Sequence, residues 1–271
     1  MRRLWILGAS DPEMVEIEVL IAGYGDECVK AAYRGRRVTS LYAYRADGVA
    51  PASWYSRCHG SPYNQCNYYD RCMLVECEVE PLPDHEVLLV VDHHRPGDPG
   101  YGVGPERYWE ASSLGQVCAW LGVAPTPERR IIAAADHCLR HAYQGRCPGV
   151  DPVELRRWRT ESRAAYQGRS VDRVREDVER AMERLQVAPV LWDGVRDMRG
   201  PVTPELPEAG AILGVAYVAS QGDRLVIGAA QPEDVVHFME VWGPANKLKN
   251  IYGDPERGFA GGYHAGDQAL R

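Results

Sequence analysis

The sequence predicts an α/β protein made of a sheet domain, a helical connector and a second, smaller α/β unit. Three observations predict this class. Short apolar runs that end in acidic residues alternate with segments of helical periodicity over the first half of the chain. Residues 151–185 are strongly helical in composition and are broken near Gly168, and new apolar runs begin after Pro189. We therefore place the domain boundaries at 1–150, 151–188 and 189–271.

Composition limits the classes of protein that fit the chain. The 271 residues suit two domains of unequal size, and 45% hydrophobic residues suffice for their cores. A net charge of −7 argues against a generally basic nucleic-acid binder but leaves room for a local basic groove. Lysine occurs only at Lys30, Lys247 and Lys249, so arginine supplies nearly all the positive charge. Arginine holds phosphates bidentately, although genomic base composition would explain the same bias.

No targeting segment is visible in the sequence. Arg2 and Arg3 precede only the apolar run 4–7, which is too short for the core of a signal peptide. The longest mildly apolar run, 209–219, contains glycines and falls short of a membrane span. We therefore expect a cytoplasmic protein without a membrane partner, in which the eight cysteines are reduced thiols.

The first elements are a strand over 4–7 and a helix over 14–22. Asp11 is placed to cap this helix, and apolar residues follow at helical spacing. Asp11 and Glu13 therefore stand at a strand-to-helix junction, at the edge of the predicted sheet. Two interpretations stay open: the carboxylates bind a ligand there, or they stabilise the helix N-terminus through its dipole.

Residues 38–44 predict a second strand, and the segment 50–72 after it has little apolar periodicity. This segment could form a small zinc loop or a polar insertion with buried cysteines. The spacing of the possible ligands matches no two-residue zinc knuckle, which favours the insertion. The possible zinc ligands are Cys58, His59, Cys66 and Cys72.

Two further strands are predicted over 73–78 and 87–91. Glu76 stands near the end of the first, and only ten residues separate Glu78 from the middle of the second. Either these strands are not neighbours or their connection is irregular, because a crossover helix needs more chain. The five apolar residues 87–91 predict a strand buried on both faces. The chain then continues as Asp92-His93-His94, where open α/β sheets bind ligands.

A helix start follows the proline- and glycine-rich loop 95–104. Ser112 or Ser113 can cap this helix, and both hydroxyls could face an anion. The run 131–137 is apolar before it reaches Asp136, and its periodicity fits a strand or a helix.

The last part of the chain predicts a small mixed unit. Strands are expected over 189–192, 211–219 and 224–230, with a helix over 234–242. The tail 257–266 is rich in glycine around one histidine. It is either a loop whose backbone approaches a ligand closely or a floppy C-terminus.

Carboxylates from separate segments are predicted to cluster with two histidines at one site. Clustered carboxylates repel one another unless cations neutralise them, so the expected occupant is a pair of divalent metal ions. Oxygen ligands with an imidazole favour Mn²⁺ or Mg²⁺. The members are Asp11, Glu13, Glu76, Asp92, His93, His94 and Asp136.

This arrangement resembles the DHH phosphoesterase superfamily, which includes RecJ-type exonucleases, oligoribonucleases, cyclic-dinucleotide phosphodiesterases and inorganic pyrophosphatases. The resemblance spans most of the chain and rests on four motifs in the family's order. One glycine of the last motif is replaced by Tyr263. The motifs are Asp92-His93-His94, Ala111-Ser112-Ser113, Asp136 and the tail Gly261-Gly262-Tyr263-His264.

The resemblance implies a parallel-sheet DHH domain, a helical connector and a smaller mixed α/β C-terminal domain. It implies a phosphoesterase that uses up to two Mn²⁺ or Mg²⁺ ions to hydrolyse a nucleotide or short single-stranded oligonucleotide. Asp92, His93 and His94 would be catalytic, with His94 near the phosphate or the leaving group. The implied metal ligands are Asp11, Glu13, Glu76, Asp92, His93 and Asp136; the implied substrate-binding residues are Ser112, Ser113, Arg257, Gly261, Gly262 and His264.

Two departures from the family's pattern bear on the activity. The first motif, usually His-x-Asp-x-Asp, has Ala9 for its histidine and Glu13 for its second aspartate. Glu76 stands where the family has a metal-bridging aspartate. An alternative from another functional class is a degenerate member of the family, which binds nucleotides or a protein without hydrolysis. The loss of an imidazole at Ala9 favours this alternative. A pyrophosphatase-like enzyme is the alternative within the family.

Overall fold

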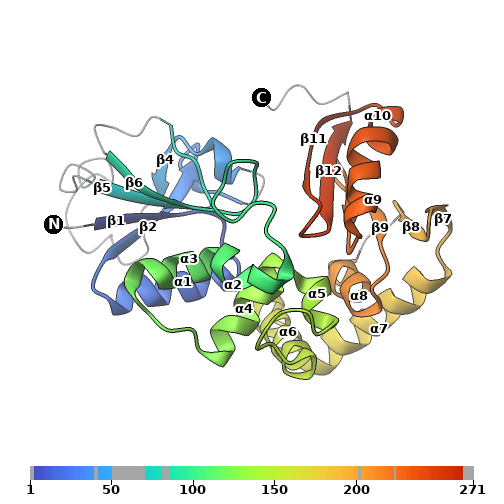
Figure 1. Ribbon diagram of the computed structural model, residues 1–271, viewed down its shortest axis with the longest axis horizontal. Helices are drawn as coiled ribbons and strands as arrows, with labels where there is room; N and C mark the ends of the chain where they lie inside the picture. Colours follow the sequence, from blue (N-terminus) through green and yellow to red (C-terminus); the bar gives the residue numbers. More distant parts are fainter. Residues whose placement is uncertain are drawn as a thin grey trace. The chain divides into compact units, whose positions relative to one another are not determined.

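The structure is a computed structural model, which describes residues 3–39, 42–50, 71–80, 86–200, 203–222 and 224–264. Contacts divide the chain into two compact units (Figure 1). The first comprises Met1–Tyr101 and Trp109–Ala133, and the second comprises Gly102–Tyr108 and Ala134–Arg271. The predicted boundaries at 150 and 188 stay a prediction. None of the described helices is both long and apolar enough to cross a membrane.

The first unit contains a sheet of order β3-β2-β1-β5-β6, with β4 paired to β2. Strands β2, β1, β5 and β6 run parallel, whereas β3 and β4 run antiparallel to β2. The strands are β1 (Arg3–Leu7), β2 (Glu27–Tyr33), β3 (Arg36–Arg37), β4 (Gly48–Ala50), β5 (Arg71–Val75) and β6 (Glu86–Val91). The helices are α1 (Pro12–Gly23), the 3-10 turn η1 (Ala43–Arg45), α2 (Tyr108–Ala111), which begins in the second unit, and α3 (Ser113–Leu121).

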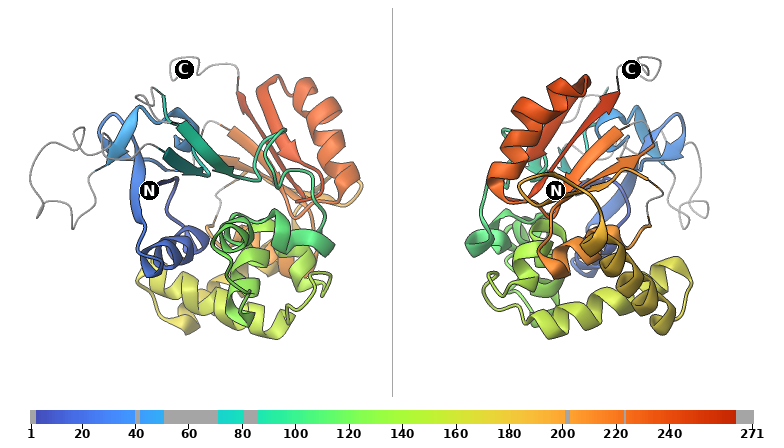
Figure 2. Two further views of the ribbon diagram at one scale, coloured as in Figure 1. Left: turned by 60° about the vertical axis from the view of Figure 1, so that its left-hand side comes forward. Right: turned by 90° about the vertical axis from the view of Figure 1, so that its right-hand side faces the viewer.

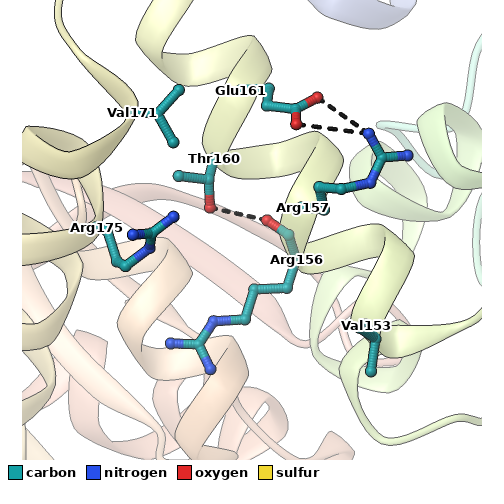
Figure 3. A pocket seen from close by; sticks show the side chains of 7 residues that line it. All are labelled: Val153, Arg156, Arg157, Thr160, Glu161, Val171 and Arg175. Carbon is teal, nitrogen blue, oxygen red and sulfur yellow. Dashed lines mark hydrogen bonds and ion pairs between the residues drawn. The ribbon is translucent and has the colours of Figure 1, made fainter.

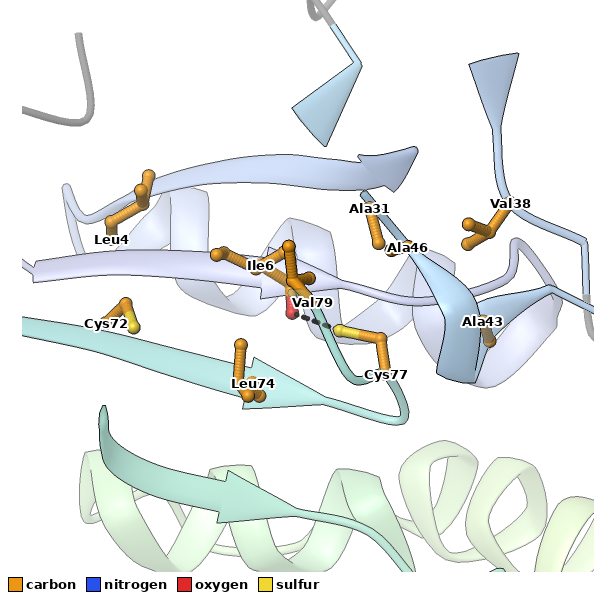
Figure 4. Packing of buried hydrophobic residues seen from close by; sticks show 10 residues of the cluster. All are labelled: Leu4, Ile6, Ala31, Val38, Ala43, Ala46, Cys72, Leu74, Cys77 and Val79. Carbon is orange, nitrogen blue, oxygen red and sulfur yellow. Dashed lines mark hydrogen bonds between the residues drawn. The ribbon is translucent and has the colours of Figure 1, made fainter. Parts of the chain in front are cut away.

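Both faces of this sheet are covered. Successive side chains of β1 point to opposite faces, so Leu4 and Ile6 share one face and Trp5 and Leu7 the other. Figure 4 shows the first face, where Leu4 and Ile6 pack in a cluster with side chains of β2, β5 and the segment 38–46. Helices α1 and α3 contact each other and the sheet. The parallel α/β class predicted for this part of the chain is confirmed.

Two strand predictions for this unit are wrong. Residues 38–44 form no strand in their described part, where η1 begins at Ala43; the sheet instead uses β2. Charged residues interrupt the apolar pattern of β2, so the sequence pattern does not identify it as a strand. Its pairing with β1 does. Strand β6 is not buried on both faces, because it is the edge strand and leaves Val87 and Val90 about 40% exposed.

The connection between β5 and β6 is irregular, which was one of the two open alternatives. The strands are parallel neighbours, with Val75 paired to Val91. The described part of their connection, 76–80, contains no helix. The parallel pairing brings the carboxyl ends of β5 and β6 side by side.

The second unit contains a mixed sheet of order β11-β12-β10-β9-β8-β7. Only the β8–β9 pair is parallel in this described sheet. The strands are β7 (Val190–Trp192), β8 (Val195–Met198), β9 (Tyr217–Gln221), β10 (Arg224–Gly228), β11 (Leu248–Asp254) and β12 (Phe259–His264). The helices are η5 (Pro105–Arg107), α5 (Leu139–Tyr143), α6 (Pro152–Gln167), α7 (Val171–Val187), α8 (Leu206–Leu213), α9 (Pro232–His237), the π-helical turn η6 (Phe238–Trp242) and α10 (Gly243–Ala245). Helix α4 (Pro127–His137) begins in the first unit and ends in the second.

Apolar side chains of the second sheet form two clusters. One joins the sheet to Val235 and Phe238 of the α9–η6 segment, which lies along the sheet in Figure 2. The other joins it to Leu206 of α8 and Leu185 of α7. The predicted mixed α/β unit is therefore confirmed.

Most predicted elements of the second half are confirmed. The predicted helical pair is α6 and α7, and Gly168 ends α6 with a positive φ of 63°. The run 131–137, left open between strand and helix, belongs to α4. The predicted strand over 211–219 is wrong in its first part, because α8 extends to Leu213 and β9 starts at Tyr217.

Buried ion pairs fasten α6 to α8. Arg159 pairs with Glu208 at 2.8 Å, and Arg163 pairs with Glu205 at 2.5 Å. The Tyr143 hydroxyl also donates to Glu208. Burial raises the pKa of Glu208, but the charge and hydrogen bond of Arg159, together with the Tyr143 hydrogen bond, bring that pKa below its ordinary value.

Arg159→Leu is expected to lower the free energy of unfolding by about 3 kcal/mol at pH 7, because it leaves the Glu208 carboxylate buried without its cation. The pairing stabilises the fold above the unfolded carboxyl pKa of about 4.3, and this stabilisation is lost as the pH falls through the lower folded pKa. Urea unfolding should therefore show a difference between wild type and variant that shrinks below about pH 4. Arg157→Leu, which removes exposed pairs with Glu154 and Glu161, is the control and should leave the midpoint unchanged. Equal midpoints for wild type and Arg159→Leu at pH 7 would contradict the assignment.

Candidate metal centre

Three parallel strands of the first unit end at one edge of the sheet and deliver polar side chains there. Glu13 follows β1, Glu76 follows β5, and Asp92-His93-His94 follows β6. Because β1, β5 and β6 are parallel neighbours, their carboxyl ends meet. The sequence prediction that these segments meet at one sheet edge is confirmed.

The side chains that meet there form a set of metal-ligand atoms. One ligand atom each of Glu13, Glu76 and His93 lie within 4.8 Å of one another, and so do those of Glu76, His93 and His94. His93 Nε2 is 3.5 Å from Glu76 Oε1. Glu13, Glu76 and His93 are 2%, 7% and 0% exposed. Two carboxylates in so little contact with water favour a bound cation, and oxygen with imidazole donors suits Mn²⁺ or Mg²⁺.

Backbone geometry fixes Glu76 at this edge. Its φ is +49°, in the left-handed region that residues with a Cβ rarely occupy. Its N–H donates to the Val91 carbonyl at 2.9 Å, which ties the end of β5 to the end of β6. A Cβ at Gly8 would lie 2.2 Å from the Glu76 carbonyl oxygen, so only glycine lets β1 approach so closely. Strained backbone that neighbours hold in place is typical of functional sites.

Glu13 is anchored by helix α3. Its Oε1 accepts the Leu114 N–H at 3.0 Å, near the N-terminus of α3, where a negative charge is stabilised. Ser112 is the N-cap of that helix, as predicted: its Oγ accepts from Gly115 N and donates to the Trp109 carbonyl. Ser112 and Ser113 are both fully buried, and their predicted contact with substrate stays a prediction.

Asp11 has the capping role that the sequence left open. Its Oδ1 accepts the Met14 N–H at 2.7 Å at the start of α1. Among the described residues, Asp11 and Asp92 belong to neither ligand group. Their direct coordination of a metal stays a prediction.

The Asp92 carboxylate is surrounded by donors. Its Oδ1 accepts from the backbone N–H of His93 at 2.7 Å and of His94 at 3.1 Å, and lies 2.8 Å from His94 Nδ1. The Tyr44 hydroxyl donates to both carboxylate oxygens, at 3.0 and 2.8 Å. Burial raises the pKa of Asp92, but the hydrogen bonds from His94, Tyr44 and the backbone, with the charge on His94, bring it below its ordinary value. The group is therefore a carboxylate at neutral pH.

Three residues that sequence reasoning missed hold this strand end. Tyr44 lies 48 residues before Asp92 and carries no local signal. Gln116 Nε2 donates to the Asp92 carbonyl at 3.1 Å and to the Ala111 carbonyl at 2.7 Å. Gly100 N–H donates to the same Asp92 carbonyl at 3.0 Å. The glycine-rich loop after the histidines was the one sequence feature that could have drawn attention to Gly100.

Asp136 and Arg257 lie in the second unit, where they contact each other. Asp136 is in the last turn of α4, and its Oδ2 is 3.5 Å from the Arg257 guanidinium. Arg257 also donates to the Asp136 and His137 carbonyls and is only 6% exposed. These contacts cap the C-terminal end of α4. Metal binding by Asp136 and substrate binding by Arg257 stay predictions.

The glycine-rich tail forms a strand over 259–264, so this part is neither a loop nor a floppy terminus. Strand β12 pairs with β10 and β11. A Cβ at Gly261 would lie 2.6 Å from the Tyr252 hydroxyl, and one at Gly262 would lie 3.1 Å from Leu248 and Ile251 side-chain atoms. These glycines are explained by packing within the sheet. Substrate contact by Gly261, Gly262 and His264 stays a prediction.

The possible zinc ligands Cys58, His59 and Cys66 lie outside the described residues. Cys72 is on β5, fully buried in the apolar cluster of Figure 4. The cysteines in the described ranges are free thiols.

A recess of about 240 Å³ lies on α6 and α7 of the second unit (Figure 3). Its lining includes Arg156, Arg157 and Arg175 and none of the residues predicted to bind substrate. Arg157 pairs with Glu161, and Arg175 pairs with Asp172. The recess is therefore an exposed surface with ion pairs.

Comparison with known proteins gives distant structural likenesses. No family model matches the chain, and no curated protein sequence matches it. The chain is similar to the structure of RecJ from Thermus thermophilus in complex with Mg²⁺, at 13% identity and a TM-score of 0.42. The similarity covers 99% of this chain and 47% of the RecJ chain, so this chain spans about half the length of that protein.

Gly100→Ala is expected to disturb the centre, because the added Cβ would lie 2.0 Å from the Ala111 carbonyl oxygen and 2.7 Å from His93 Cβ. We expect a free energy of unfolding lower by about 2 kcal/mol, as for overpacked cores. Mn²⁺ affinity, measured by calorimetry, should fall with it because His93 is displaced. Gly23→Ala, which meets no atom within 4 Å, is the matched control. If both variants bind Mn²⁺ like the wild type, Gly100 does not position His93.

Proposed function

We propose that this protein is a divalent-metal-dependent phosphoesterase that hydrolyses phosphodiester or phosphoanhydride bonds of a nucleotide or short oligonucleotide. The observation that carries the proposal is the set of two buried carboxylates and two imidazoles at the carboxyl ends of three parallel strands. The order of motifs that resembles the DHH superfamily supports the same reaction class. Manganese or magnesium, up to two ions, fits this donor set.

Two overlapping sets would hold metal: Glu13, Glu76 and His93, and Glu76, His93 and His94. The second set uses His94, which the DHH resemblance places near the phosphate or the leaving group. A bound divalent cation supplies Lewis acidity to a phosphoryl oxygen and makes water a stronger nucleophile. Glu76 and His93 are buried, so their charge and lone pairs are shielded from bulk water. The Asp92 carboxylate at His94 Nδ1 stabilises a proton on that nitrogen and orients the ring.

A short substrate agrees with the charge of the protein. The net charge of −7 repels long polyanions, whereas a nucleotide or short oligonucleotide needs few cationic contacts. Arg95 follows His94 directly and pairs with Glu78 at 2.9 Å; its side chain is 45% exposed, so a substrate phosphate could compete for it.

A second candidate is a degenerate DHH-like module that binds nucleotides or a protein without hydrolysis. Ala9 favours it, because this half-buried residue in the β1–α1 turn stands where the family has a histidine. A binder of this kind need not hold two metal ions. Metal stoichiometry on the purified protein separates the two candidates.

Glu13→Gln is expected to weaken Mn²⁺ binding at least about tenfold, the equivalent of about 1.4 kcal/mol. The amide oxygen can still accept the Leu114 N–H, so the anchor to α3 survives while the charge is lost. Titration calorimetry measures the affinity, and hydrolysis of dinucleotides, cyclic dinucleotides and pyrophosphate measures activity. Glu16→Gln is the matched control on the same helix, because Glu16 pairs with Arg129 instead. Wild-type affinity in Glu13→Gln would exclude Glu13 as a ligand.

Activity should rise with Mn²⁺ in two phases, because the site nearer Ala9 lacks an imidazole ligand. Loss of a ligand worth about 1.4 kcal/mol weakens one site roughly tenfold relative to the other. Ala9→His should bring the phases together by tightening the weaker site. A single tight phase in the wild type would show that another group already fills the position, and no metal dependence would leave only the binding module.

A further inference from the structure

One oxygen of the Asp92 carboxylate, Oδ1, is occupied by donors from the protein itself. It accepts two backbone N–H groups, lies 2.8 Å from His94 Nδ1 and also receives the Tyr44 hydroxyl. Oδ1 therefore has few lone pairs left for a cation, whereas the one described contact of Oδ2 is the Tyr44 hydroxyl at 2.8 Å. The described ligand groups agree, because they contain His93 and His94 but not Asp92. This departs from the role that the DHH resemblance implies for the aspartate.

The contact between Asp92 and His94 determines which ring nitrogen can bind a metal. With Nδ1–H donating to the carboxylate at 2.8 Å, the lone pair of the neutral ring is on Nε2. A carboxylate behind a ligating histidine fixes the tautomer and the ring orientation and makes the imidazole a better ligand. Because a ring nitrogen of His94 belongs to the group with Glu76 and His93, the tautomer matters there.

Tyr44 holds the carboxylate in this orientation. Its hydroxyl contacts both carboxylate oxygens, so the plane of the group cannot rotate without breaking one contact. The Tyr44 ring is fixed in turn: the Arg95 guanidinium lies 3.5 Å from its centroid, and the His94 ring lies edge-on at 6.3 Å. Burial and the nearby Asp92 and Glu76 carboxylates raise the pKa of Tyr44 far above its ordinary value, so the phenol remains a donor.

We propose that Tyr44 is a positioning residue of the metal centre, which holds Asp92 so that this carboxylate acts through His94. His94, together with Glu76 and His93, is then the ligand on this side of the centre, and Asp92 is its hydrogen-bond partner. The proposal rests on the proposed metal-dependent function. It adds a residue from outside the recognised motifs.

Tyr44→Phe tests the proposal, because it removes the hydroxyl and keeps the ring under Arg95. Mn²⁺ affinity measured by calorimetry should fall by up to about tenfold, the lower end of the range for removal of a ligand's own hydrogen-bond partner, because Tyr44 acts one contact further away. In the metal-free protein, ¹⁵N NMR of the histidine rings should show a smaller fraction of the Nδ1–H tautomer at His94. Tyr42→Phe is the matched control, because Tyr42 stacks on Tyr33 and should change neither readout. Wild-type affinity and an unchanged His94 tautomer in Tyr44→Phe would overturn the proposal.

Asp92→Asn supplies a second variant and a double-mutant cycle. If Tyr44 acts through Asp92, the Tyr44→Phe/Asp92→Asn protein should bind Mn²⁺ no more than about twofold more weakly than Asp92→Asn alone. If the losses of Mn²⁺ affinity in the two single variants multiply in the double variant, the proposal is overturned. It is also overturned if Asp92→Asn loses all Mn²⁺ binding while Tyr44→Phe keeps wild-type affinity. Absence of Mn²⁺ binding in the wild type would instead refute the proposed function. In that case the ¹⁵N NMR comparison of the His94 tautomer in wild type and Tyr44→Phe would still decide whether Tyr44 positions the His94 ring.

Discussion

The constraint on which the first unit depends is the burial of negative charge at one edge of its sheet. Glu13 and Glu76 are nearly inaccessible to water and stand beside a fully buried imidazole. Burying a carboxylate is unfavourable unless a cation or hydrogen bonds compensate it. Part of the compensation is visible in the chain itself, since the α3 N-terminus donates to Glu13. The grouping of two buried carboxylates with an imidazole is the physical reason to propose a metal.

The chain holds this charge with backbone contacts that only small residues permit. Gly8 lets β1 pass against the Glu76 carbonyl, and Gly100 lets the loop after β6 pass against His93. The left-handed φ of Glu76 directs its side chain away from the path of a regular strand. A rigid frame of this kind suits a ligand site, because it keeps donors in place without help from the ligand.

Ion pairs serve a different purpose in the second unit. The pairs of Arg159 with Glu208 and of Arg163 with Glu205 are buried, and each carboxylate already has its cation within the chain. Such pairs join α6 to α8 and leave no excess charge for a ligand. Arg257 likewise uses its guanidinium on the end of α4. The buried acids of the first unit differ because they lie beside imidazoles as possible metal ligands, which is why we propose a metal there.

The sequence by itself determined what depends on neighbouring residues. Helix caps at Asp11, Ser112 and Gly168 were predictable because a cap is a local contact between residues a few positions apart. The acids and histidines at the ends of apolar runs were predictable for the same reason, and the parallel class was implied by the resemblance to the DHH superfamily. The tertiary structure decided what depends on distant partners. Strand β2 exists because β1 pairs with it, and the glycine-rich tail is a strand because β10 and β11 flank it. Only the folded chain brings Tyr44 to Asp92, since a hydrogen bond across 48 residues leaves no periodic trace in the sequence.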